Sequence, residues 1–154
     1  MIYFTKVRWK NFMSFGNQMT EVELDKSPTT LIIGENGAGK STLLDAICYS
    51  LYCKSFRNVG SYSLVNSINK KGCVTEVEFR VGTKHYKVQR RMKPPGFKMW
   101  CDGEQILAGS SHKEHQAVLE DKILKMRFNT FKQVVLLGSA NHVAFMMLPT
   151  WQRR

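Results

Sequence analysis

Alternating apolar and polar residues at the start of the chain predict β-strands. In residues 2–10, Val7 and Trp9 fall on one face and basic residues fall on the other. Residues 18–24 alternate in a similar way. Residues 29–33 form an apolar, β-branched run, which is typical of a buried strand. Three strands are therefore expected before the first glycine-rich segment.

The period then changes to that of a helix and later returns to that of strands. Residues 42–52 carry leucine and isoleucine at helical spacing, so a helix is expected there. Residues 74–107 alternate again, and Asp102-Gly103 within them is a hairpin signal. We expect an antiparallel meander that extends the edge of the sheet. Residues 53–72 have no clear period and are expected to form a long surface segment.

The last third of the chain predicts a helix, a strand and the start of another helix. Ser111 is followed three residues later by Glu114, a capping box that predicts a helix running to about residue 125. Residues 130–137 are apolar and β-branched, as in a buried strand. Residues 150–154 follow a proline and are expected to begin a further helix. Together these elements predict an α/β fold.

The segment Gly34-Glu35-Asn36-Gly37-Ala38-Gly39-Lys40-Ser41 joins the strand expected at 29–33 to the helix expected at 42–52. It matches the phosphate-binding pattern G-x-x-x-x-G-K-[ST] at every fixed position. Glycines let successive backbone N–H groups turn toward a phosphate, and the helix start adds its positive dipole end. The alternative is a glycine-rich turn that matches by accident, and the flanking strand and helix argue against it.

The polar residues of this phosphate loop (residues 34–41) have expected tasks. Lys40 should reach the β- and γ-phosphates and act in catalysis, the Ser41 hydroxyl should bind Mg²⁺, and Thr42 can hydrogen-bond a phosphate. The rest of the cradle is expected from Asn36, Gly37, Ala38 and Gly39. ATP and Mg²⁺ are therefore the expected cofactors.

The charge balance adds a second expected partner. The chain has 23 Lys and Arg residues against 12 Asp and Glu, a formal net charge of +11. Nucleotide binding does not require so much positive charge, so nucleic acid is favoured over a basic surface kept for solubility. The expected contacts precede the meander or lie on its displayed faces, opposite Val88: Lys70, Lys71, Lys87, Arg90 and Arg91. The alternative is a solvated strand face.

The remaining composition restricts the compartment. The four cysteines form no CxxC pair, and no histidine lies at zinc-ligand spacing from them. The histidines lack partners at catalytic spacing. No apolar run approaches the length needed to span a membrane, and the N-terminus lacks the form of a signal peptide. A cytoplasmic protein with reduced thiols and no membrane partner is expected.

Three segments together resemble a known family. They are residues 10–15 (KNFMSF), 34–52 (GENGAGKSTLLDAICYSLY) and 136–145 (LLGSANHVAF). In this order and spacing they resemble the N-terminal ATPase lobe of SMC-like DNA double-strand-break-repair proteins of SbcC type, in the branch found in large tailed phages. The resemblance implies that residues 1–154 form one lobe of an ABC-ATPase-type head, a P-loop NTPase with a mixed sheet and an antiparallel β meander.

The family also implies partners. A C-terminal lobe, reached through a coiled coil that would begin at about 150–154, supplies the signature motif, the acidic Walker B strand and the catalytic glutamate. Two ATP molecules join two heads, the partner is an SbcD-type metal-dependent nuclease, and the substrate is a DNA end. The chain is thus expected to be the ATP-binding half of a DNA-repair ATPase and to be inactive by itself.

One departure from the family pattern lies near the start of the chain. Family members often carry Arg or Asn before the serine that corresponds to Ser14, where this chain has Met13. A nucleotide contact is therefore expected from Ser14 and not from the preceding side chain.

The second departure concerns the glutamine that couples Mg²⁺ to the attacking water. An ungapped comparison with the family pattern through Phe131 and Phe145 puts Ser139 at that position, within a glutamine-loop equivalent at about 138–145. Ser139 is therefore the expected second metal contact and catalytic residue. Asn141 is the nearest amide, and Gln133 is set aside because it lies within the apolar run expected to be a strand.

Other functions remain open at this point. The nucleotide-binding domain of a membrane transporter has a nearly identical phosphate loop, but its glutamine loop usually follows much sooner than the 99 residues between Lys40 and Ser139. The meander, and the lack of an evident lid for a substrate phosphate, argue against a small P-loop kinase. A clamp that binds nucleotide and DNA without turnover is a third alternative.

Overall fold

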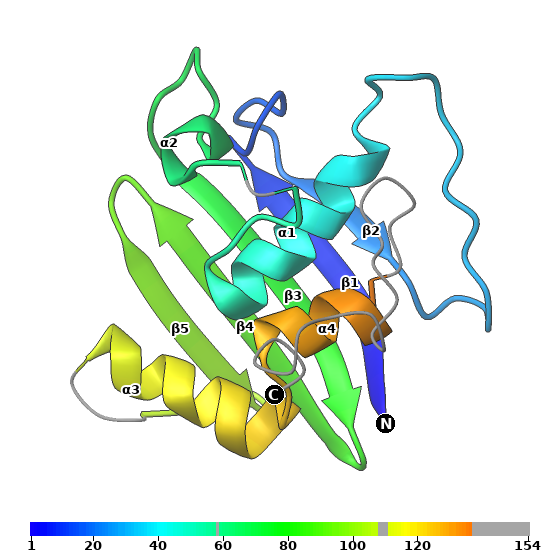
Figure 1. The fold of residues 1–154 in the computed structure, drawn as a ribbon, viewed down its shortest axis with the longest axis vertical. Helices are drawn as coiled ribbons and strands as arrows, with labels where there is room; N and C mark the ends of the chain where they lie inside the picture. Colours follow the sequence, from blue (N-terminus) through cyan, green and yellow to red (C-terminus); the bar gives the residue numbers. More distant parts are fainter. Residues whose placement is uncertain (58, 108–110, 137–154) are drawn as a thin grey trace.

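Strand β1 (Ile2–Lys10) organises a six-stranded antiparallel sheet (Figure 1). It pairs with β2 on one side and β3 on the other, and the order across the sheet is β2-β1-β3-β4-β5-β6. The other strands are β2 (Thr20–Glu23), β3 (Cys73–Val81), β4 (Lys84–Met92), β5 (Gly96–Cys101) and β6 (Glu104–Gln105). This is a computed structural model, and it describes residues 1–57, 59–107 and 111–136. The predicted meander is confirmed.

The strand expected at residues 29–33 is not formed. Leu31, Ile32 and Ile33 are 81%, 41% and 81% exposed, and the chain runs outside the sheet here (Figure 1). An extended run becomes a strand only when a neighbouring strand pairs with its N–H and C=O groups. No strand among the described residues pairs with it. The described sheet is therefore antiparallel throughout, whereas the sequence predicted a mixed sheet.

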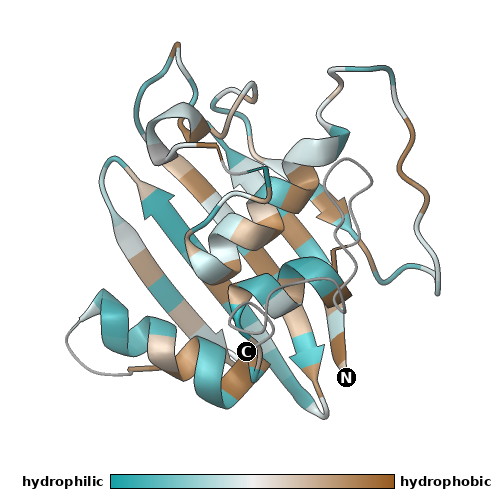
Figure 2. Cartoon of the chain, viewed as in Figure 1, coloured by the Kyte–Doolittle hydropathy of each residue, from teal (hydrophilic) through white to brown (hydrophobic). Residues whose placement is uncertain are grey.

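The helices lie on one face of the sheet, and the apolar side chains between the two layers form the core. Helix α1 (Lys40–Tyr52) packs on β1, β3 and β4, and all its residues from Leu43 onward except Leu44 are buried. Figure 2 shows hydrophobic residues of the central strands behind α1. Val7, Val77 and Phe79 on those strands are fully buried. Such burial stabilises the fold by about 1.5–3 kcal/mol for each large apolar side chain.

The capping box predicted at Ser111 is confirmed at the start of α3 (His112–Ala117). The backbone N–H of Glu114 donates to the Ser111 hydroxyl, and the backbone N–H of Ser111 donates to the Glu114 carboxylate, both at 3.2 Å. The helix continues as a π-helical segment, η1 (Val118–Leu124), and ends at Lys125, whose φ is 51°. Its predicted extent is therefore correct.

The strand expected at residues 130–137 is wrong, because most of this segment belongs to helix α4 (Phe128–Val134). The predicted run began too late to include Phe128, which lies three residues before the buried Phe131 and so completes a helical spacing. Both rings pack on Tyr52 of α1, with ring centroids 5.5 and 5.1 Å away. Aromatic packing against α1 therefore decides the conformation.

Residues 53–72 are more than a surface segment. They contain a short helix, α2 (Ser61–Leu64), and both Leu64 and Val65 are buried. Asn66 is also buried, and its backbone N–H donates to the carbonyl of Asn11 (2.9 Å). The segment is thus fixed to the loop that follows β1.

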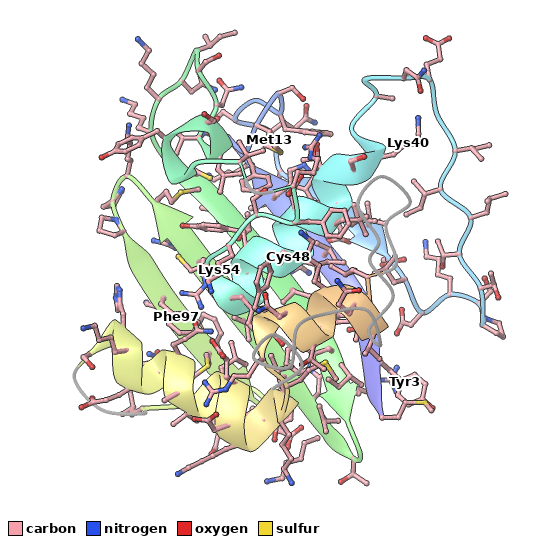
Figure 3. All side chains as sticks on the ribbon, in the orientation of Figure 1. Tyr3, Met13, Lys40, Cys48, Lys54 and Phe97 are labelled. Atoms are coloured by element: carbon pink, nitrogen blue, oxygen red, sulfur yellow. The ribbon has the colours of Figure 1, made fainter. Side chains whose placement is uncertain are left out.

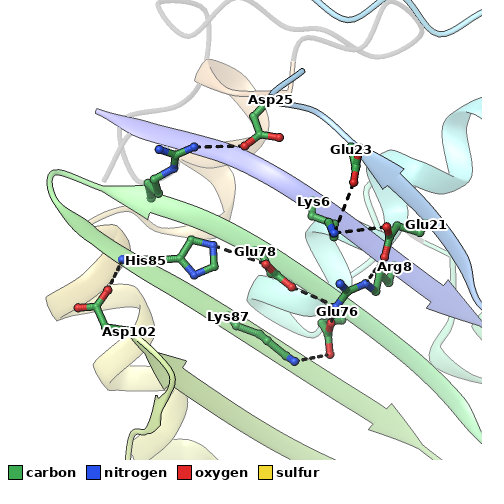
Figure 4. A network of polar contacts seen from close by, with 11 residues as sticks. Lys6, Arg8, Glu21, Glu23, Asp25, Glu76, Glu78, His85, Lys87 and Asp102 are labelled. Atoms are coloured by element: carbon green, nitrogen blue, oxygen red, sulfur yellow. Dashed lines mark hydrogen bonds and ion pairs between the residues drawn. The ribbon is translucent and has the colours of Figure 1, made fainter. Parts of the chain in front are cut away.

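The face of the sheet opposite the helices is a lattice of ion pairs (Figure 4). Arg8 on β1 donates to Glu21 on β2 (2.5 Å) and to Glu76 and Glu78 on β3, the latter at 3.0 Å. These bonds, chiefly the one to Glu21, raise the pKa of Arg8 above its usual value. The charge of Arg8 is thus balanced by carboxylates on two neighbouring strands.

Arg90 was predicted to be displayed, but it points into the core and is 6% exposed. Period-two alternation puts Arg90 on the same face as Val88, so its assignment to the outer face was an error of parity. Its guanidinium donates to the carbonyls of Ser50 (2.9 Å) and Leu51 (3.3 Å) at the end of α1. It also donates to Gln116 and lies 3.7 Å from the centre of the Phe97 ring. Burial lowers its pKa from the usual value.

Arg90→Ala should lower the free energy of unfolding by about 1.5–3 kcal/mol, because it removes charged hydrogen bonds to the α1 carbonyls. Arg91→Ala is the matched control: it truncates the neighbouring arginine on the exposed face and should change stability by less than about 0.5 kcal/mol. Urea unfolding of both variants measures the difference. Equal destabilisation would contradict the capping role of Arg90.

Candidate nucleotide-binding site

The phosphate loop reaches α1 through two glycines in the left-handed region. Gly37 and Gly39 have φ values of 88° and 96°, which residues with a Cβ rarely adopt. The backbone N–H of Ala38 donates to the carbonyl of Glu35 (3.1 Å), which closes the loop on itself. No side chain caps the N-terminus of α1 directly after Gly39. The backbone N–H of Thr42 donates to the carbonyl of Gly39 (3.0 Å), which leaves the N–H groups of Lys40 and Ser41 available to an acceptor at the loop.

Lys40 turns back into the loop from the first position of α1 (Figure 3). Its ammonium group donates to the carbonyl oxygens of Gly34 (2.5 Å) and Glu35 (2.7 Å). The helix dipole and this ammonium place positive charge at the same point. The arrangement therefore fits a phosphate group.

The next two residues have different environments. Ser41 is exposed, so its hydroxyl is accessible to a metal ion that arrives with a nucleotide. Thr42 is buried on the side of α1 that faces the core. Asn36 is exposed in the loop. The residues fit Mg²⁺ bound together with a nucleotide, and the described residues contain no cluster of His, Cys, Asp and Glu that could hold a metal ion by itself.

Phe15 also supports the phosphate loop, and sequence reasoning missed it. A Cβ built on Gly39 would lie 2.5 Å from the Phe15 ring, so only glycine permits this approach. Ser14, the predicted nucleotide contact, lines a hollow beside α2 that includes no residue of the phosphate loop. The structure therefore brings Phe15, the neighbour of Ser14, against the loop.

A second missed group connects the middle of α1 to the loop after β1. Asp45 is fully buried and accepts from the Ser55 hydroxyl (2.7 Å) and from Arg57 Nε (2.7 Å). Arg57 also reaches Met13, with 3.2 Å from Nη2 to the sulfur. An aspartate among the apolar residues of a predicted helix was the available signal, since a buried carboxylate requires a partner.

The predicted DNA contacts separate into three environments. Lys70, Lys71 and Arg91 are exposed. Lys87 is half-buried, with its ammonium 3.5 Å from Glu76 and 5.1 Å from the centre of the Trp100 ring. Arg90 is buried in the core. Only the first three present charge to solvent without a close carboxylate partner in the described part of the chain.

Several predicted features lie outside the described residues. These are Ser139, Asn141, the glutamine-loop equivalent at 138–145 and the helix expected at 150–154. Gln133 lies in α4, so the reason for setting it aside, its position in a strand, was wrong. Across residues 1–57, 59–107 and 111–136, no helix is long and apolar enough to cross a membrane.

The sequence matches the AAA domain family over residues 6–145. The chain belongs to the AAA domain family. Exonuclease subunit 2 of Enterobacteria phage T4 is 40% identical over 149 residues, which cover 97% of this chain and 26% of that protein. The Rad50 DNA double-strand-break-repair ATPase of Methanocaldococcus jannaschii is 32% identical over 148 residues, covering 93% of this chain and 14% of that protein.

The SbcC component of the SbcCD nuclease of Pseudomonas aeruginosa is 27% identical over 176 residues, covering 91% of this chain and 14% of that protein. The predicted kinship with SbcC-type ATPases and their phage relatives is thus confirmed. The chain spans about a quarter of the length of the phage exonuclease protein it matches.

Solved structures agree on the fold. A structure from work on the ATP-driven dimerisation and DNA-stimulated activation of SMC ATPases has a TM-score of 0.65 and 23% identity, covering 98% of this chain and 95% of that chain. An Smc head domain from Pyrococcus furiosus has a TM-score of 0.62 and 24% identity, covering 85% of this chain and 35% of that chain. The predicted ATPase-head fold is confirmed.

Lys40→Ala should weaken the binding of a fluorescent ATP analogue at least about tenfold, the equivalent of about 1.4 kcal/mol, because it removes the cation at the phosphate loop. The urea midpoint should stay within error of the parent, since Lys40 bonds only to its own loop. Lys122→Ala, which removes an exposed lysine of η1, is the control. If Lys40→Ala binds ATP as tightly as the parent, the loop is not the nucleotide site.

Proposed function

We propose that the chain is the ATP-binding lobe of a DNA-repair ATPase that acts with a metal-dependent nuclease on DNA ends, in the host-cell cytoplasm. The observation that carries this proposal is the phosphate loop with Lys40 turned into it, at the head of a helix buried in an ATPase-head fold. The names of the relatives, a phage exonuclease subunit and the SbcC component of the SbcCD nuclease, support the nuclease and DNA-repair context.

Within this lobe, the loop backbone and Lys40 hold the β- and γ-phosphates, and the Ser41 hydroxyl holds the metal ion. When bound there, Mg²⁺ would supply positive charge that balances the charge of the phosphates. Phe15 and Asp45 keep the loop and α1 in place and do not touch the nucleotide. Ser139 remains the proposed partner of the metal and the attacking water, with Asn141 as its alternative.

A C-terminal lobe is proposed to complete the head. The exposed run of Leu31, Ile32 and Ile33 directly precedes the phosphate loop and has unpaired backbone groups in the described structure. A neighbouring strand from that lobe would pair with it and bury its side chains, and would carry an acidic metal-binding residue close to Ser41. Two such heads would then join around ATP.

A clamp that binds nucleotide without turnover is the second candidate. It is favoured because the described residues show no ion pair between a carboxylate and the phosphate loop, where Lys40 bonds to the carbonyls of Gly34 and Glu35. The transporter alternative has no support from the relatives, which are nuclease-complex and repair proteins by name.

The chain alone should hydrolyse ATP negligibly, because positioned charge and a water-orienting residue supply most of the catalysis in phosphoryl transfer. Turnover should appear when a separately supplied C-terminal lobe and DNA are added, and Lys40→Ala should abolish it. A phosphate-release assay measures each mixture. Robust turnover by the chain alone would contradict the two-lobe proposal, and none in any mixture would favour the clamp.

The DNA surface is proposed to lie at the end of the sheet where Lys70, Lys71 and Arg91 are exposed, a set we call the basic end. In the assembled head, their triple alanine variant should bind duplex DNA more weakly. The log–log salt slope should fall by about 0.9 for each phosphate that the variant no longer neutralises. The control is Lys113→Ala with Lys122→Ala, two exposed lysines on α3 and η1. An unchanged slope would remove the basic end from the DNA path.

A further inference from the structure

A hollow beside α2 lies outside the phosphate loop. It has a volume of about 670 Å³, within the range of about 300–1,000 Å³ usual for small-ligand sites. Its polar rim comes from serines and lysines on three segments of the chain: Ser14, Ser63, Ser67, Lys70 and Lys93. None of these side chains belongs to the phosphate loop or to the ion-pair lattice.

The walls of the hollow are held by hydrogen bonds that link distant parts of the chain. The backbone N–H of Met13 donates to the carbonyl of Leu64 (2.7 Å), and the Asn66 amide donates to the carbonyl of Met13 (3.1 Å). The backbone N–H of Lys70 donates to the carbonyl of Asn66 (2.9 Å). The hollow is therefore pre-formed, which lowers the entropy cost of binding a ligand.

Tyr62 stands on the rim of the hollow and is 88% exposed. So large an aromatic surface is not needed for packing here. The ammonium group of Lys93 lies 5.9 Å from the centre of its ring, which places a cation at the aromatic face. An aromatic face next to a cation is suited to a ligand that has both a flat ring and a negative charge.

A second lysine lines the same hollow. Lys70 and Lys93 both line the hollow, and the backbone N–H of Gly72 donates to the carbonyl of Lys93 (2.8 Å), which keeps the two segments together. The serine hydroxyls on the rim add neutral donors. The residues described as lining the hollow include no carboxylate that could neutralise the lysines. The charge is therefore available to a phosphate.

We infer that this hollow binds one unpaired nucleotide of a single-stranded nucleic acid, with its base stacked on Tyr62 and its phosphates on Lys70 and Lys93. The inference rests on the proposed function, because it specifies which form of DNA end the head holds. A paired base inside a duplex is already stacked and cannot present its face to Tyr62, so the aromatic contact selects single strands. No residue of the phosphate loop lines the hollow.

The test compares two ten-nucleotide probes, oligothymidylate and an abasic strand with the same phosphates, by fluorescence anisotropy with the intact chain. The parent should bind oligothymidylate about tenfold more tightly, since stacking on one aromatic ring has this effect. Tyr62→Ala should abolish the difference and Tyr62→Phe should keep it. The control is Tyr3→Ala, which removes an exposed tyrosine at the opposite end of β1 (Figure 3).

The lysines are tested with the same probes. Lys70→Ala combined with Lys93→Ala should weaken the binding of both probes. It should also lower the log–log salt slope by about 0.7 for each phosphate that is no longer neutralised. If Tyr62→Ala still distinguishes the two strands, or if the parent does not, the inference is overturned. Binding of the ATP analogue by the same variants should not change. A negative result for the hollow is therefore distinct from a negative result for the nucleotide site, which Lys40→Ala tests.

Discussion

Burial of α1 is the interaction on which the rest of the structure depends. Its apolar residues fill the space between the sheet and α4, and each of its parts is tied to a different segment. The phosphate loop precedes it, Asp45 at its middle holds Arg57, and its last carbonyls accept from Arg90 of β4 and Gln116 of α3. Because these contacts come from several segments of the chain, the loop is attached to a helix that has little freedom to shift or rotate.

The outer face of the sheet carries paired charges, whereas the face under the helices belongs to the apolar core. On the outer face, three cations and four carboxylates alternate across strands: Lys6, Arg8 and Lys87 with Glu21, Glu23, Glu76 and Glu78. Such pairs hold register between neighbouring strands and leave almost no net field. The positive excess of the chain therefore lies elsewhere, and part of it is concentrated at the basic end. This distribution separates a structural surface from a surface that attracts polyanions.

Sequence patterns predicted those elements whose signals are local. The capping box at Ser111, the phosphate loop and the alternation in β1 and β3 each depend on a few neighbouring residues, and each is present in the structure. Strand formation at 29–33 depends on a partner that local sequence does not contain. The helical state of α4 depends on packing against Tyr52, which lies far away in the chain.

Only part of the nucleotide site could be predicted from the sequence. Lys40 and the glycines follow from a motif with fixed spacing. The support from Phe15 and Arg57 arises only through tertiary contacts, so no spacing rule indicates it. Arg90 shows a different limit. The alternation of β4 places it on the inner face with Val88, but the excess of basic residues led to its assignment to the outer face.

The exposed run before the phosphate loop has a consequence for how the chain behaves in solution. An apolar, β-branched segment with unpaired backbone groups is a template for another strand, including the same segment of a second molecule. Pro28 on one side and Glu35 on the other bracket it, and such residues interrupt the growth of intermolecular sheets. These flanking residues thus act as gatekeepers against aggregation, while the run itself stays available for pairing.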